Sequence, residues 1–201
     1  MNKSLLRDGY LIIKNFISKS IAKKHADTFQ YAYEQNLLTE DEQVSNSLIS
    51  YNPKLAKDLQ YEKCNAVSSI IGSKVLPTYC FARMYRKGNV LKKHTDRPAC
   101  EISLTLHLNG DRSWPIWITT PKGNDVDVEL ESGDAMVYLG CTAPHWREEY
   151  LGDNYSQVFF HYVREEGSCS SHAYDVYYGT TQTSFTKEHH QILLKEYSNL
   201  L

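Results

Sequence analysis

The sequence predicts an α+β fold in which helices precede and follow a double-sheet β core. Apolar residues recur at helical spacing over roughly the first 74 residues. From about residue 75 to 165, short runs rich in Val, Ile, Thr, Tyr and Phe recur between turn residues. Residues 186–201 are rich in Lys, Glu, His and Leu, which predicts a closing helix. Helices followed by many short strands are typical of an antiparallel double-sheet core.

Length and charge restrict what the protein does. The 201 residues fit one domain, 1–201, with a helical part at about 1–74, a β core at about 75–165 and an extension at 166–201. With 22 Lys and Arg against 24 Asp and Glu, the chain lacks the clustered positive charge that nucleic-acid binding requires. Its apolar runs are far shorter than the roughly 20 residues that span a bilayer. We therefore expect a cytoplasmic protein that binds neither nucleic acid nor membrane.

The cysteines do not form a recognisable ligand or disulfide pattern. There are 5 of them, widely scattered and never in a C-x-x-C pair. A disulfide framework or a thiolate zinc site is therefore not expected. Any metal ion would have to be held by histidines and carboxylates.

The helical part contains one short strand and two helices. Residues 10–13 form an apolar run after Gly9, which predicts a strand. Ser18 is placed to cap a helix whose apolar face runs from residue 21 to 33. Pro53 indicates a break, and residues 55–71 predict a second helix that ends near Gly72.

The β core is read from six runs of strand-forming residues, at 78–85, 101–108, 114–119, 126–130, 135–139 and 157–163. The clearest is the second, in which apolar residues at 102, 104, 106 and 108 alternate with polar residues. Such alternation predicts a strand with two different faces. The Asn-Gly-Asp segment at 109–111 then predicts a turn.

Three residues of the β core have the composition of a metal site. His94 and Asp96 are two residues apart, which places both side chains on one face of an extended segment. His145 follows 51 residues later, just after the predicted strand at 135–139. Two imidazoles and one carboxylate are the facial triad of non-haem Fe(II) oxygenases, which leaves positions open for a cosubstrate and dioxygen. The pair His-x-Asp alone is weak evidence for a metal site, because such a pair easily occurs by chance on the solvated surface of a chain with 8 His and 24 acidic residues.

The order of several motifs is more specific than the pair. The chain resembles the Fe(II)- and 2-oxoglutarate-dependent dioxygenases, particularly the prolyl-hydroxylase-like branch. The resemblance covers roughly residues 75–163 and is carried by the segments Arg-Met-Tyr-Arg-Lys-Gly at 83–88, His-Thr-Asp at 94–96, the alternating strand at 101–109, Glu-Ser-Gly-Asp-Ala-Met-Val-Tyr at 131–138, and His145. The segment Asp-Gly-Tyr-Leu-Ile-Ile at 8–13 is similar to the family's N-terminal region.

The resemblance implies a fold and a reaction. The core would be a double-stranded β-helix, a cupin-like jelly roll, flanked by the N-terminal helices and a C-terminal helix. The chain would be a hydroxylase that couples oxidation of a C–H bond to the decarboxylation of 2-oxoglutarate, with release of succinate and CO2. The resemblance assigns His94, Asp96 and His145 as Fe(II) ligands and Tyr85 as a ligand of the 2-oxoglutarate carboxylate, with ascorbate as a reductant. The alternative for Tyr85 is a core aromatic residue.

One expected residue is missing. The family usually has Arg or Lys about ten residues after the distal His to bind the far carboxylate of 2-oxoglutarate, and here Tyr155 stands at that point. The substitutes are Arg147, which is favoured by its spacing from His145, then Arg83, which shares a face with Tyr85, then Arg164. The alternative for Arg147 is an ion pair with a nearby glutamate, at position 148, 149 or 101.

The missing cation keeps two other functions open. One is a catalytically silent jelly-roll binding protein, and the other is a metal-dependent cupin enzyme that does not use 2-oxoglutarate. By fold-level analogy the substrate is an amino acid or a peptidyl side chain, that is, a small molecule or a peptide. Loop-like residues at 41–51 and 167–183 are placed to contact it. The sequence leaves the oligomeric state open.

Overall fold

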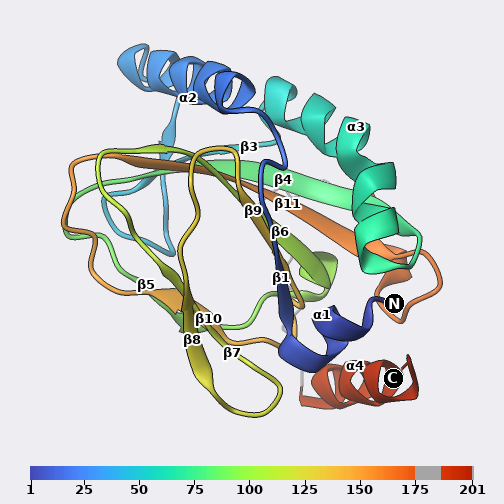
Figure 1. The fold of residues 1–201 in the computed structure, drawn as a ribbon. Coiled ribbons are helices and arrows are strands. Elements are labelled where there is room, and N and C mark those ends of the chain that lie inside the picture. Colours follow the sequence, from blue (N-terminus) through green and yellow to red (C-terminus); the bar gives the residue numbers. More distant parts are fainter. Residues whose placement is uncertain (175–186, 201) are drawn as a thin grey trace.

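The computed structural model describes residues 1–174 and 187–200, and all the strands of these residues lie in two antiparallel sheets. The seven-stranded sheet has the order β1 (Tyr10–Ile13), β9 (Ala135–Tyr138), β6 (Ile102–Gly110), β11 (Tyr155–Arg164), β4 (Val75–Tyr85), β3 (Leu48–Tyr51) and β2 (Thr39–Glu40). The four-stranded sheet has the order β5 (Leu91–His94), β10 (His145–Arg147), β7 (Ile116–Thr119) and β8 (Asp125–Val128). This is the predicted jelly-roll core, with helices on the outer face of the larger sheet (Figure 1).

Two helices cover the larger sheet, and their boundaries confirm the sequence signals. Helix α2 (Lys19–Glu34) begins after Ser18, whose Oγ accepts a hydrogen bond from the backbone N–H of Ile21 at 3.2 Å. Helix α3 (Lys54–Ile71) begins after Pro53 and ends at Gly72, which has the left-handed φ of 68°. Both helices lie over the sheet in Figure 1, α2 against β6 and α3 against β4.

Two further helices flank the core. Helix α1 (Lys3–Asp8) was not predicted; Asn2 caps it by accepting hydrogen bonds from the N–H groups of Ser4 and Leu5. The predicted closing helix is α4 (Lys187–Leu200), which buries Leu193 and Tyr197. Of the expected loop at 167–183, residues 175–183 lie outside the described residues. None of the helices in the described parts of the chain is both long and apolar enough to cross a membrane.

Strand β6 separates the hydrophobic core from the interior of the barrel, as its alternation predicts. Its apolar residues, including Leu104 and Leu106, join the core cluster with residues of α2 and α3. The opposite face carries Ser103, Thr105 and His107, which are also buried. Thr105 Oγ1 accepts a hydrogen bond at 2.9 Å from Gln157 of β11. The polar face therefore points into the barrel, where it meets polar side chains of the neighbouring strand.

Four short strands were absent from the prediction. Strands β2 and β3 form a hairpin that pairs with β4, so the expected loop at 41–51 includes β3. Strands β5 and β10 pair with each other in the smaller sheet. These strands are only two to four residues long, which is too short for a periodic pattern, and β3, β5 and β10 also pair with segments that are distant in sequence.

Candidate metal centre and its cavity

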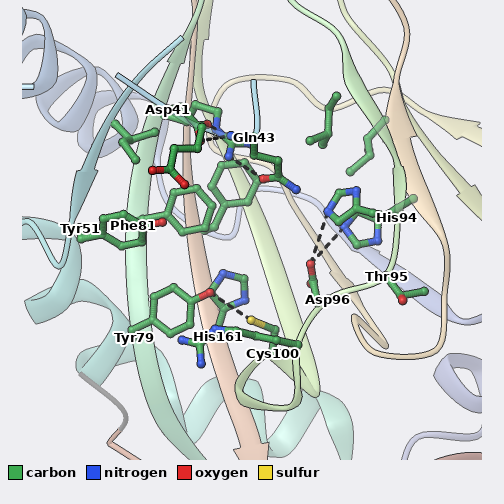
Figure 2. A pocket seen from close by; sticks show the side chains of 18 of the residues that line it. Asp41, Gln43, Tyr51, Tyr79, Phe81, His94, Thr95, Asp96, Cys100 and His161 are labelled. Atoms are coloured by element: carbon green, nitrogen blue, oxygen red, sulfur yellow. Dashed lines mark hydrogen bonds and ion pairs between the residues drawn. The ribbon is translucent and has the colours of Figure 1, made fainter. Parts of the chain in front are cut away.

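The three predicted metal ligands lie together at one wall of the barrel. Figure 2 shows two of them, His94 and Asp96, facing each other. His94 ends β5 and His145 begins β10, and the two residues face each other in the pairing of these strands. Asp96 follows β5, and its backbone N–H donates to the carbonyl of Gly140 at 2.9 Å. Asp96 Oδ1 lies 3.6 Å from Nε2 of His94 and 3.6 Å from Nε2 of His145. Three donor atoms at this separation fit around one metal ion with bonds of about 2 Å.

Hydrogen bonds fix the orientation of both imidazoles. Nδ1 of His94 lies 2.8 Å from the carbonyl of Lys92, and Nδ1 of His145 lies 3.0 Å from the carbonyl of Ala143. A carbonyl oxygen only accepts, so each Nδ1 carries a proton, which leaves each Nε2 as the ring atom that can bind a metal ion. The donor set, two neutral imidazoles and a carboxylate, suits Fe(II) and leaves positions open on the metal.

The carboxylate is held from its other side. Asp96 Oδ2 accepts a hydrogen bond from Ser103 Oγ at 2.7 Å. A Cβ atom at Gly140 would lie 2.5 Å from Asp96 Oδ2 and 2.6 Å from Ser103 Oγ, so only glycine fits at this position. Neither contact follows from a sequence motif. The close approach of Gly140 joins segments about 40 residues apart, and the bond from Ser103 to Asp96 depends on how the turn between β5 and β6 folds.

The electrostatics of the three ligands favour a divalent cation. In the metal-free site burial raises the pKa of Asp96, but the charge of protonated His145 and the hydrogen bond and charge of protonated His94 outweigh burial, so the pKa lies well below its usual value. Burial lowers the pKa of His145, and Asp96 only partly offsets this effect. For His94, burial also lowers the pKa, but the hydrogen bond and the charge of Asp96 raise it above its usual value. A metal ion would take the place of these protons.

A cavity of about 800 Å³ opens beside the three ligands. One wall is aromatic. The rings of Phe81 and Phe159 stack with centroids 4.5 Å apart, and the ring centroids of Tyr79 and His161 lie 4.6 Å apart. The charged residues of the lining are, apart from the ligands, Glu40, Asp41, Glu42, Arg83 and Arg97. The cavity therefore joins the candidate metal centre to an aromatic wall and to charged side chains, of which Asp41 and Arg83 are buried.

Arg83 is the predicted anchor residue that lines this cavity. The residue is 3% exposed and lies on the barrel face of β4. Its Nη1 donates to the hydroxyl of Tyr85 at 3.0 Å and its Nη2 donates to Gln43 Oε1 at 2.8 Å. Its Nε lies 2.6 Å from Asp41 Oδ2. Tyr85, as predicted, shares the face of Arg83, but it is fully buried and is not part of the lining.

Arg147 lies outside the cavity, in a cluster of aromatic residues. Its Nη1 donates to the backbone carbonyl of Trp114, and its guanidinium carbon lies 4.7 Å from the Trp114 ring centroid and 5.1 Å from that of Tyr155. Its Nε and Nη2 have no hydrogen-bond partner among the described residues. His145 and Arg147 share the buried face of β10, as their spacing predicts, and the extra residue at the register shift lies in the partner strand β5.

Arg164, the third candidate, is bound elsewhere. Its Nε donates to Glu101 Oε1 at 2.5 Å, and its Nη2 donates to Glu196 of helix α4. Arg164 therefore fastens the C-terminal helix to the core. Glu101, considered above as a partner of Arg147, forms its ion pair with Arg164 instead.

His161 is a cavity residue that the sequence did not assign. Its Nδ1 lies 3.0 Å from Ser103 Oγ, and its buried Nε2 has no hydrogen-bond partner among the described residues. Burial lowers its pKa to about 4. The alternation of Phe159, His161 and Val163 along the strand was the signal for its inward position, but alternation alone does not assign a role.

His107 gives a prediction for acid stability. Burial lowers its pKa to about 4, and the charge of Arg147 acts in the same direction. The unfolded chain takes up this proton near pH 6.5, so the stabilisation is complete above that pH and is lost as the pH falls towards 4. We expect His107→Phe to reduce the dependence of the unfolding free energy on pH by about 1.4 kcal/mol per pH unit in this window, measured by urea unfolding of the metal-free protein. An unchanged slope would contradict the assignment.

Comparison with known proteins identifies the fold. No protein-family model matches the sequence, and no curated protein matches it significantly. Among solved structures, a prolyl-4-hydroxylase from Pseudomonas putida is similar with a TM-score of 0.67 and 17% identity, over 80% of this chain and 95% of that chain. A Trichoplax adhaerens prolyl hydroxylase in complex with a hypoxia-inducible-factor peptide is similar with a TM-score of 0.67 and 14% identity, over 84% of this chain and 88% of that chain.

A third similar structure contains ligands. HygX from Streptomyces hygroscopicus, with nickel and 2-oxoglutarate bound, has a TM-score of 0.65 and 11% identity, over 83% of this chain and 89% of that chain. These likenesses confirm the predicted jelly-roll fold.

Proposed function

We propose that the chain is a non-haem Fe(II)- and 2-oxoglutarate-dependent oxygenase of the prolyl-hydroxylase-like type, with His94, Asp96 and His145 as the iron ligands. The observation that carries the proposal is the convergence of two oriented Nε2 atoms on one Asp96 oxygen, each at 3.6 Å, at the wall of a cavity. Bound iron and 2-oxoglutarate would together supply the chemistry that lets dioxygen oxidise a C–H bond, with release of succinate and CO2. Ascorbate would serve as the reductant.

Each protein residue then has a physical task. The three ligands hold the metal from one side, so that its remaining positions face the cavity. Arg83 binds the far carboxylate of 2-oxoglutarate, because it is the anchor candidate whose guanidinium lines the same cavity as the ligands. Tyr85 supports Arg83 through its hydroxyl rather than by touching the cosubstrate. Phe81 and Phe159 exclude water from the reacting groups.

Arg147 is the weaker anchor on this structure. A carboxylate could reach it only if the aromatic rings of Tyr85, Trp114 and Tyr155 moved, since Tyr85 and Tyr155 each contact Trp114 at centroid distances of 4.8 Å and 5.3 Å. The same packed cluster favours a second candidate function, a metal-dependent cupin enzyme that does not use 2-oxoglutarate, because aromatic side chains stand where the family has its cation.

The substrate is proposed as an amino acid or peptidyl side chain. The similar structures include one with a peptide and one of HygX with hygromycin B bound, so this fold accommodates both classes. The cavity wall formed by residues 39–43 borders the space that a substrate would enter, as expected for the loop at 41–51. The five cysteines, all in the described part of the chain, are free thiols, which supports the cytoplasm as the site of action.

The decisive test uses the metal and cosubstrate directly. Anaerobic addition of Fe(II) and then 2-oxoglutarate is expected to give a weak visible charge-transfer band, and admission of air is expected to yield succinate. A band without succinate would indicate a silent binding protein. Metal binding without either signal would favour the cupin enzyme that does not use 2-oxoglutarate.

A further inference from the structure

The loop at residues 41–47 forms part of the cavity wall and is tied to the barrel. Val44 is buried in the aromatic cluster that contains Tyr85 and Trp114. The carbonyl of Ser45 accepts a hydrogen bond from Asn89 Nδ2 at 2.8 Å. Figure 2 shows Asp41 and Gln43, the residues through which this loop reaches Arg83, close together above the aromatic wall.

Asp41 is a buried carboxylate that is held in a fixed position. Its Oδ1 accepts the backbone N–H of Gln43 at 2.9 Å, and its Oδ2 accepts Ser47 Oγ at 3.2 Å. The same Oδ2 lies 2.6 Å from Arg83 Nε, and both side chains are at most 6% exposed. Arg83 is therefore already neutralised by an anion that belongs to the protein.

We propose that Asp41 competes with the far carboxylate of 2-oxoglutarate for Arg83, so that Asp41 sets the affinity for the cosubstrate and couples its binding to the loop at 41–47. This inference rests on the proposed function. Two carboxylates at one guanidinium repel each other strongly where water is excluded. Binding of the dicarboxylate therefore displaces Asp41, and with it the contacts that hold the loop against Arg83.

The competition is tested by removing one charge. Asp41→Asn keeps the size of the side chain and an oxygen for Ser47, but leaves Arg83 with a net positive charge. In protein loaded with Zn(II), which binds without turnover, we expect its dissociation constant for 2-oxoglutarate to fall by about 10-fold, measured by titration calorimetry. Glu42→Gln is the matched control, because Glu42 is an exposed residue of the same cavity wall; its dissociation constant should stay within about 2-fold of the wild-type value.

A second variant and a second measurement keep the proposal testable if Asp41→Asn does not fold. Ser47→Ala removes a hydrogen bond from Asp41 without changing the charge, and should tighten binding in the same direction by a smaller factor. Hydrogen exchange of residues 41–47 should increase when 2-oxoglutarate binds to the wild-type protein. In Asp41→Asn it should be high already without the cosubstrate.

The outcomes separate this inference from the proposed function. If the wild-type protein binds 2-oxoglutarate while Asp41→Asn binds it equally or more weakly, Asp41 positions Arg83 instead of competing for it, and only this inference is overturned. If neither wild type nor variant binds 2-oxoglutarate, the proposed function fails and the competition fails with it. Unchanged loop exchange on binding would overturn the coupling to the loop.

Discussion

Replacing His94 or His145 with alanine is expected to weaken Fe(II) binding by at least about 100-fold and to abolish succinate formation. Each substitution removes one of two imidazoles whose Nε2 atoms lie 3.6 Å from Asp96 Oδ1. The remaining pair of ligands cannot hold a divalent ion against water at the open side. Anaerobic titration calorimetry gives the affinity, and circular dichroism should show that the helices stay folded.

A matched control separates the loss of a metal ligand from the effect of replacing any histidine with alanine. His189→Ala changes the same residue type at an exposed position on helix α4 and should bind Fe(II) like the wild type. A second set of possible ligands, Asp96, Cys100 and His161, also lies within 4.8 Å. Metal binding that survives in both His94→Ala and His145→Ala but is lost in His161→Ala would place the metal in this second set and contradict our assignment.

The parts of the fold that the sequence predicted are those with a local cause. Helix α2 follows from a capping Ser18 and from helical spacing of apolar residues, and β6 follows from strict alternation over 102–109. Strands β5 and β10 have no such signal. They are short, and they hold His94 opposite His145 only because segments 51 residues apart pair with each other.

In the candidate site, too, some residues could be predicted from the sequence and others could not. Residue types and motif order were enough to select His94, Asp96 and His145, which the structure brings together and which we propose as metal ligands. Spacing alone did not single out the anchor. Arg147 does share the buried face of β10 with His145, but its guanidinium packs against Trp114 and is not part of the cavity lining. The contact between Asp41 and Arg83 depends on how a loop folds over the barrel end, which no periodicity describes.

Replacing Arg83 has the second large expected effect, because it tests which cation serves 2-oxoglutarate. Arg83→Gln should raise the concentration of 2-oxoglutarate required for half-maximal activity by about 10- to 100-fold, corresponding to about 1.5–3 kcal/mol for a lost charge-assisted contact. The affinity for Fe(II) should change little, since Arg83 is not a ligand. Steady-state kinetics with varied 2-oxoglutarate and a separate metal titration measure the two quantities.

The ion pair with Asp41 complicates the single substitution, because it leaves a buried carboxylate without its cation. The double variant Arg83→Gln with Asp41→Asn removes both charges, and should recover thermal stability without recovering cosubstrate affinity. Arg147→Gln should show the reverse: a lower melting temperature, because its guanidinium packs on Trp114 and Tyr155, with little change in the 2-oxoglutarate requirement. If Arg147→Gln raises that requirement and Arg83→Gln does not, the cosubstrate enters the aromatic cluster, and the rings around Tyr155 must move to admit it.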